Sequence, residues 1–188
     1  IPEGYAQRII SDESDLDIYP NSGDWTDMNT VNETGKRAGR YMYRTHEVRP
    51  GTDPFLGGAI SIVDLKTGEA EVLAQRADWE ALDGLVWTPW QTLLFAEETI
   101  TAQLPDPDVP AAQSGLLYEL KFANNDPTKV EEIKVRPKLG SLSHEGIEID
   151  DEGNVYVIDE DRKGAIYKFV PDTYGDLSSG QLHALRVK

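Results

Sequence analysis

The chain has 188 residues, 34 of them acidic and 18 basic, which gives a net charge of −16. So large a negative charge excludes nucleic acid and anionic membrane surfaces as natural partners, and it suits a protein that binds cations. The chain has no cysteine, which excludes disulfides and thiolate metal sites, and no apolar run approaches the ~20 residues of a membrane-spanning helix.

Residues 1–38 are polar and rich in turn-forming residues, and we expect them to form an extended lead-in. The stretch "SDESDLDIYPNSGDW" shows neither a helical nor a strand period. Residues 39–188 are then expected to form one domain. The chain begins at Ile1 rather than Met, so a removed leader and a trimmed boundary both remain open. An extracytoplasmic location (secreted, periplasmic or in an organelle lumen) is the corresponding expectation.

From Gly39 onward, short β-type runs alternate with turns rich in Gly, Pro and Asp. Only "RADWEALDGL" could form a helical turn or two. This pattern predicts an all-β sandwich, barrel or propeller. The predicted strands are 39–48, 58–65, 69–74, 83–87, 92–98, 115–122, 130–135, 145–150, 154–160, 164–170 and 181–187.

An internal repeat favours the propeller. "LDGLVWTPWQTLLFAEE" (82–98) aligns without a gap with "HEGIEIDDEGNVYVIDE" (144–160), and "GLLYEL" returns as "GAIYKF". A period near 50 residues is typical of propeller blades, each a four-stranded antiparallel sheet. One blade would run from 83 to 135, with 99–114 inserted between its second and third strands. About three blades are present, whereas closure takes at least four. We therefore expect an incomplete β-propeller, completed by further blades or by a protein partner.

Each copy of the repeat is predicted to be a hairpin with carboxylates at its open end. A turn at 151–154 pairs Glu145 with Glu160, and the same register pairs Asp83 with Glu98. A bulge would shift this register by one residue and bring in Asp159 or Glu97 instead. The motifs around His46-Glu47 and His144-Glu145 suggest similar acidic strand ends.

Opposed carboxylates ~5 Å apart repel each other by about 3 kcal/mol at an effective dielectric of ~20. Either one of them takes up a proton, or a hard cation such as calcium lies between them. Acids at equivalent ends of successive blades converge on the mouth of the central channel, so we expect a metal-binding funnel there. Solvated acids that merely decorate the hairpin ends are the alternative.

Three stretches resemble the PhoX-type alkaline phosphatases, a family of secreted bacterial phosphomonoesterases. They are "NETGKRAGRYMYRTHEV", "LDGLVWTPWQTLLFAEE" and "LGSLSHEGIEIDDEGNVYVIDE", followed by "GAIYKFVP". The resemblance implies a six-bladed propeller with a calcium and ferric iron cluster that is held mainly by carboxylates. By motif, Glu97, Glu98 and Glu145 would be ligands, with Glu47 and Glu160 as further candidates.

Two residues depart from the family pattern. Gln91 stands where the family has glycine, and Ala96 stands where it has an iron-bound cysteine. The second departure puts the iron site in doubt and leaves an all-oxygen calcium site intact, so whether the chain is an enzyme stays open.

We therefore expect a metal-dependent hydrolase of small phosphate esters. The alternative is a non-catalytic, calcium-stabilised propeller segment that serves a larger assembly, and a lactonase-type calcium propeller is a third reading. Arg40 and Arg44 could grip a phosphate or lie on an outer blade face. His46 and His144 are expected to hydrogen-bond the adjacent sheet.

Overall fold

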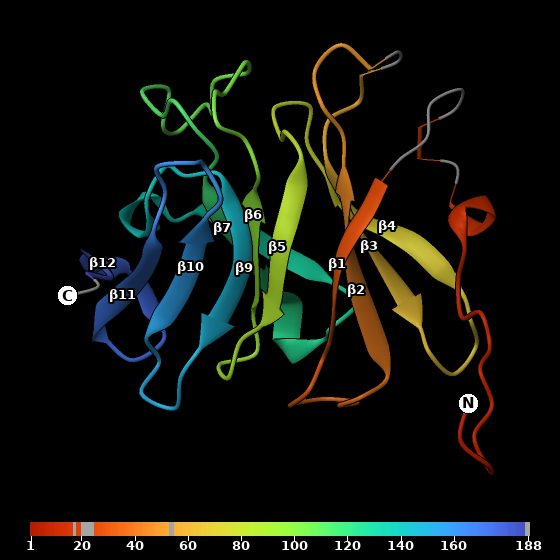
Figure 1. Cartoon of the computed structure of the whole chain (residues 1–188). Coiled ribbons are helices and arrows are strands. Elements are labelled where there is room, and N and C mark those ends of the chain that lie inside the picture. The colour runs from red at the N-terminus through yellow and green to blue at the C-terminus, as the bar shows by residue number, and fades with distance from the viewer. Residues whose placement is uncertain (17, 20–24, 53–54, 187–188) are drawn as a thin grey trace.

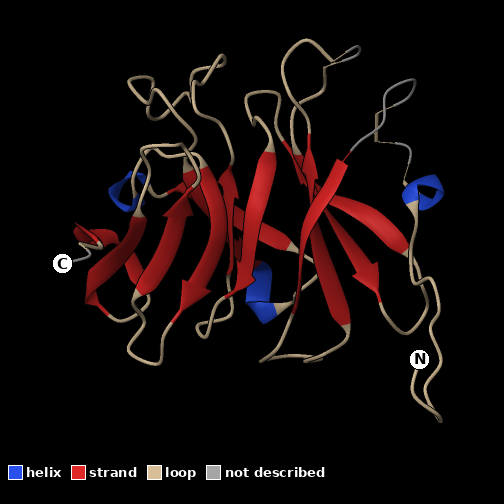
Figure 2. Ribbon diagram, in the orientation of Figure 1, coloured by secondary structure: helices blue, strands red, loops and turns tan. Residues whose placement is uncertain are grey.

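The computed structural model describes residues 1–16, 18–19, 25–52 and 55–186, and their regular structure is almost entirely β. Strands dominate Figure 2, and the described helices are three single 3₁₀ turns at Glu13–Asp15, Ala123–Asn125 and Pro137–Leu139. No helix in the described part of the chain has the length and apolar character needed to cross a membrane.

The strands form three four-stranded antiparallel sheets, as the repeat predicts for propeller blades. The first sheet contains β1 (Trp25–Val31), β2 (Tyr41–Glu47), β3 (Ala59–Asp64) and β4 (Ala70–Gln75). The second contains β5 (Leu82–Trp87), β6 (Leu93–Glu97), β7 (Leu117–Phe122) and β8 (Val130–Val135). The third contains β9 (His144–Ile149), β10 (Val155–Asp159), β11 (Ile166–Thr173) and β12 (Asp176–Ala184).

The first strands of the three sheets, β1, β5 and β9, are neighbours, so the sheets stand side by side like blades around an axis (Figure 1). Aromatic side chains fill the space between the first two sheets, where Tyr43 stacks on Trp87 with ring centroids 5.7 Å apart. A smaller apolar cluster that includes Leu94, Val157 and Phe169 joins the second sheet to the third. Burial of these side chains provides the packing that holds the blades in register.

Three sequence-based expectations need correction. The predicted lead-in contains β1, which pairs with β2 as the first strand of a sheet; its polar sequence, WTDMNTV, hides the strand period because most of its side chains are exposed or half-buried. Residues 76–85 contain no helix. Arg76 and Trp79 close one hydrogen-bonded turn, and the backbone of Trp79 and Ala81 also bonds to residues just beyond the ends of neighbouring strands: Gly58, Val48 and Glu98. The last strand starts at Asp176 rather than at 181, since it extends to the turn at Gly175.

The hairpin register differs from the predicted one by one residue. Val155 pairs with Ile149 and Leu93 with Trp87, because each turn has a three-residue loop, 151–153 or 89–91. Such loops place their third residue in the left-handed region, and Gly153 and Gln91 do so with φ of 81° and 65°. The tight closure of the loop therefore sets the register of both hairpins.

Candidate metal centre

A β-bulge interrupts the first strand of every sheet at the same place and carries a carboxylate. In each bulge two residues oppose one on the neighbouring strand: 27–28 against 45, 83–84 against 96, and 145–146 against 158. The first residue of each pair is Asp27, Asp83 or Glu145. Because a bulge turns its extra side chain out of the ladder, the three acids leave their sheets at equivalent positions.

Gly84, the second residue of the middle bulge, explains how closely two of these acids approach each other. A Cβ atom added at Gly84 would lie 2.2 Å from the backbone oxygen of Glu145. Only glycine allows the third sheet to come this near. This close approach brings Asp83 and Glu145 together.

The second strand of each sheet supplies another carboxylate where it ends. Glu98 donates its backbone N–H to Ala81, and Glu160 donates to Ser143 in the equivalent hydrogen bond of the third sheet. Glu47 occupies the corresponding place at the end of β2. The loops that follow these strands leave the same end of the three sheets (Figure 1). We call Asp27, Glu47, Asp83, Glu98, Glu145 and Glu160 the acidic cluster.

The acidic cluster is crowded enough to retain protons. The carboxyl group of Asp83 lies within hydrogen-bonding reach of Glu145, and that of Glu98 within reach of Glu160. Burial raises the pKa of Asp83 to about 9, helped by the hydrogen bond to Glu145 and by the charge of Asp27. Burial likewise raises the pKa of Glu98 to about 8, and the pKa of Asp27 is also raised. Without a metal ion, carboxyl groups at these positions accept protons rather than ionise together.

Arg49 reaches into this cluster from the loop after β2. Its Nε donates to Glu47 at 2.6 Å, and its Nη2 donates to Glu98 at 2.7 Å. The guanidinium thus joins carboxylates from two neighbouring sheets. The charge of Arg49 opposes the rise in the pKa of Glu98.

Two predicted ligands, Glu97 and Asp159, use their oxygens elsewhere. Glu97 accepts hydrogen bonds from the backbone N–H of Glu80 and of Leu116, at 2.9 and 3.0 Å. Burial raises its pKa to about 7. Asp159 accepts from the backbone N–H of Ser143 at 3.2 Å. Successive side chains of a strand point to opposite faces, so Glu97 faces away from the cluster that Glu98 joins.

The predicted phosphate-binding arginines lie apart from the acidic cluster. Arg40 donates to Asp64, with its Nη2 2.6 Å from the carboxylate, at the opposite end of β2 from Glu47. Arg44 donates to the hydroxyl of Ser11 at 2.8 Å. Their described contacts are therefore with the first sheet and the segment that precedes it.

The two histidines differ in their contacts. His46 lies 2.7 Å from the hydroxyl of Ser61 through Nε2, as expected for a histidine that bonds the sheet. His144 is fully buried, and among the described residues neither of its ring nitrogens makes a well-formed hydrogen bond, although the backbone of Gly140 lies near enough to oppose the effect of burial on its pKa. Burial lowers the pKa of His144 to about 4, which keeps the ring neutral at ordinary pH.

The acidic cluster has the donors that calcium prefers and lacks those expected for thiolate-bound iron. Calcium accepts six to eight oxygen ligands in flexible geometry, and all six acids supply carboxylate oxygens. Ala96 is buried among apolar side chains such as Leu94 and Leu117, so no sulfur donor stands at the position of the family's cysteine. Within the described residues, no three His, Asp or Glu side chains have the arrangement of a formed metal site.

Asp27 was missed by the sequence analysis. It lies 20 residues before Glu47, whereas 15 residues separate Asp83 from Glu98 and also Glu145 from Glu160. Because the hairpin of β1 and β2 is longer, it does not fit the gapless alignment that reveals the hairpins β5–β6 and β9–β10. The signal that could have found Asp27 is the strand-like run "TDMNTV" ahead of the turn at 32–40.

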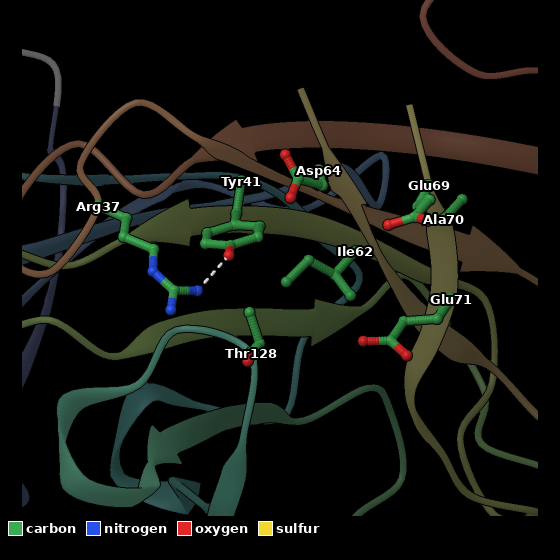
Figure 3. A pocket seen from close by; sticks show the side chains of 8 residues that line it. All are labelled: Arg37, Tyr41, Ile62, Asp64, Glu69, Ala70, Glu71 and Thr128. Atoms are coloured by element: carbon green, nitrogen blue, oxygen red, sulfur yellow. Dashed lines mark hydrogen bonds between the residues drawn. The ribbon is translucent and has the colours of Figure 1, made fainter. Parts of the chain in front are cut away.

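A large hollow of the described surface lies away from the acidic cluster. It is an open groove of about 470 Å³ beside Tyr41, at the opposite end of β2 from Glu47, and Arg37 donates to the hydroxyl of Tyr41 at its edge (Figure 3). Its other lining residues are Ile62, Asp64, Glu69, Ala70, Glu71 and Thr128. None of the predicted ligands lines it, so concavity alone does not identify the candidate centre.

Comparison with known proteins supports one assignment. The family model described as alkaline phosphatase PhoX matches residues 86–188. This range includes the end of β5, the strands β6, β7 and β8 of the second sheet, and the whole third sheet. A search of curated proteins and a search of solved structures each found no match.

Proposed function

The chain belongs to the alkaline phosphatase PhoX family, and on that basis we propose that it is a metal-dependent phosphomonoester hydrolase domain whose acidic cluster binds calcium. The substrate would be a small phosphate ester, and the protein would act outside the cytoplasm. Further blades or a protein partner would complete the propeller.

The proton-sharing pair of Asp83 and Glu145 is the observation that carries the proposal. These acids come from neighbouring sheets and both leave the ladder at a bulge. Asp83 is buried and Glu145 is exposed, and two carboxyl groups held this close destabilise the fold when both are ionised. A divalent cation removes that cost, because it takes the place of the shared proton.

The chain's own residues would then have distinct tasks. Asp27, Asp83 and Glu145 would hold calcium from the bulges, and Glu47, Glu98 and Glu160 would hold it from the strand ends. Bound calcium would polarise a phosphoryl oxygen and offset the negative charge that develops during hydrolysis. Glu97 would support the centre indirectly, because its bonds to two backbone N–H groups fix the end of β6.

A non-catalytic, calcium-stabilised segment is the second candidate, and Ala96 is the observation that favours it. Without a sulfur ligand at this position, the residues do not fit the family's iron, and calcium is the weaker Lewis acid. The acidic cluster would then serve stability and assembly rather than turnover.

Hydrolysis of p-nitrophenyl phosphate with added calcium tests the proposal. We expect phosphate release that Glu145→Gln abolishes, because the amide loses the charge that binds calcium. Glu131→Gln is the matched control: this exposed glutamate lies on the outer strand β8, far from the cluster. No turnover with any metal but a calcium-dependent rise in melting temperature would favour the second candidate. Failure of calcium to change either quantity would overturn both.

A further inference from the structure

The guanidinium of Arg49 supplies a positive charge between the first and second sheets. It bonds Glu47 from the first sheet at 2.6 Å and Glu98 from the second at 2.7 Å. The side chains of these two glutamates are only 8% and 15% exposed. Poorly solvated carboxylates need a positive partner, and in this structure Arg49 supplies it.

The backbone of Arg49 is fixed, whereas its side chain reaches solvent. The preceding residue, Val48, is buried and accepts the backbone N–H of Ala81 at 2.8 Å. The carbonyl of Arg49 accepts the hydroxyl of Thr52 at 2.8 Å. The arginine side chain itself is 52% exposed, so rotation away from both glutamates leaves the backbone of β2 in place and gives up, besides the two ion pairs, a 3.5 Å hydrogen bond to the carbonyl of Glu98.

We propose that Arg49 is an exchangeable cation: it neutralises Glu47 and Glu98 in the metal-free protein, yields them to calcium, and then binds the phosphate group of the substrate. This inference rests on the proposed calcium binding. Calcium binds carboxylate oxygens at about 2.3–2.6 Å, so an ion that takes those oxygens must displace the guanidinium. The displaced group stays tethered beside the ion, and a guanidinium binds phosphate oxygens in pairs.

The two halves of this role predict opposite changes when Arg49 is removed. Half-exposed ion pairs contribute little free energy, so removing them only modestly lowers the cost of calcium binding to Glu47 and Glu98. We expect Arg49→Ala to bind calcium about three- to tenfold more tightly than the wild type. The calcium-saturated variant should bind phenylphosphonate, a phosphate-ester analogue that is not hydrolysed, at least about tenfold more weakly. A purely structural role would weaken both.

Calorimetric titration of the chelator-treated protein, first with calcium chloride and then with phenylphosphonate, measures both affinities. Arg40→Ala is the matched control, because it removes an arginine that pairs with Asp64 at the other end of β2. Neither affinity should change more than about twofold in that variant. If Arg49→Ala does not fold, as judged by circular dichroism, Arg49→Gln replaces it, since the amide keeps a donor but removes the charge.

The outcomes separate this inference from the proposed function. Calcium binding in the wild type with unchanged affinity in the Arg49 variants would overturn the exchange and leave the calcium centre standing. Unchanged phenylphosphonate binding would overturn the substrate half. Calcium binding that appears only in the variants would support the exchange, and its absence from every protein would overturn both the exchange and the calcium centre.

Discussion

The carboxyl groups of Asp83 and Glu145 lie within hydrogen-bonding reach of each other although they belong to different sheets and are 62 residues apart in the chain. Each is the first residue of a β-bulge, and the missing side chain of Gly84 lets the two strands approach. A hydrogen bond between them requires a proton, because two ionised carboxylates have no hydrogen to share. The pair therefore links the protonation of the site to the packing of the sheets.

Replacing Asp83 with Asn should stabilise the metal-free protein. The amide donates to Glu145 without taking up a proton, so repulsion at neutral pH falls. We expect a gain of about 1 kcal/mol, which raises the melting temperature of a domain of this size by about 2–4 °C. The same variant should lose most of the stabilisation by calcium. Asp150→Asn, at the turn end of β9, serves as the control that keeps the calcium response. A calcium response of wild-type size in Asp83→Asn would contradict the proposed centre.

The metal-free protein should lose stability as the pH rises from about 5 to about 9. The pKa values of Asp83 and Glu98 are raised in the folded state, to about 9 and about 8, so the folded chain binds more protons than the unfolded chain across this range. The stabilisation is complete below the ordinary carboxyl pKa and disappears as the pH passes the raised values. Melting curves in a chelator at several pH values measure this. Stability that instead increased steadily toward pH 9 would count against a crowded cluster.

Replacing Gln91 with Gly should stabilise the hairpin of β5 and β6. Gln91 adopts φ of 65° at the position that Gly153 fills in the hairpin of β9 and β10. A side chain at positive φ is strained, so we expect a gain of about 0.5–1 kcal/mol. Gly39→Ala is the reverse control: its φ is 76° and a new Cβ would meet no atom within 4 Å, so its loss isolates the backbone cost. Urea denaturation of both variants gives the comparison, and destabilisation by Gln91→Gly would show that the glutamine side chain has another role.

His144→Leu should leave stability unchanged or raise it by about 1 kcal/mol. In the part of the chain that the structure describes, the buried ring nitrogens of His144 make no well-formed hydrogen bond, and the equivalent position of the second sheet holds the buried Leu82. Leaving polar atoms buried without partners costs about 1–3 kcal/mol. His46→Leu is the contrasting variant, because it removes the hydrogen bond between His46 and the buried hydroxyl of Ser61. Its free energy of unfolding should fall by about 1–3 kcal/mol. Loss of calcium binding in His144→Leu would instead place this histidine at the centre.

Local patterns were enough to predict the class of fold and most of the strands. Alternating apolar residues between Gly, Pro and Asp turns indicated an all-β chain, and the complete second sheet and the loop at 99–114 were located correctly. These features depend on neighbouring residues in the sequence. The first strand was the exception, because β1 has a mostly exposed, polar sequence and takes its strand form from pairing with β2.

The sequence by itself determined that carboxylates stand at the open ends of two repeated hairpins, because strand ends and turns are local features. Only the tertiary structure decided which acids meet. The bulges turn Asp83 and Glu145 toward each other, strand alternation directs Glu97 away from Glu98, and packing of the first sheet brings in Asp27 and Arg49. A bulge and the contact between two sheets depend on residues far apart in the chain, so no spacing within one segment reveals them.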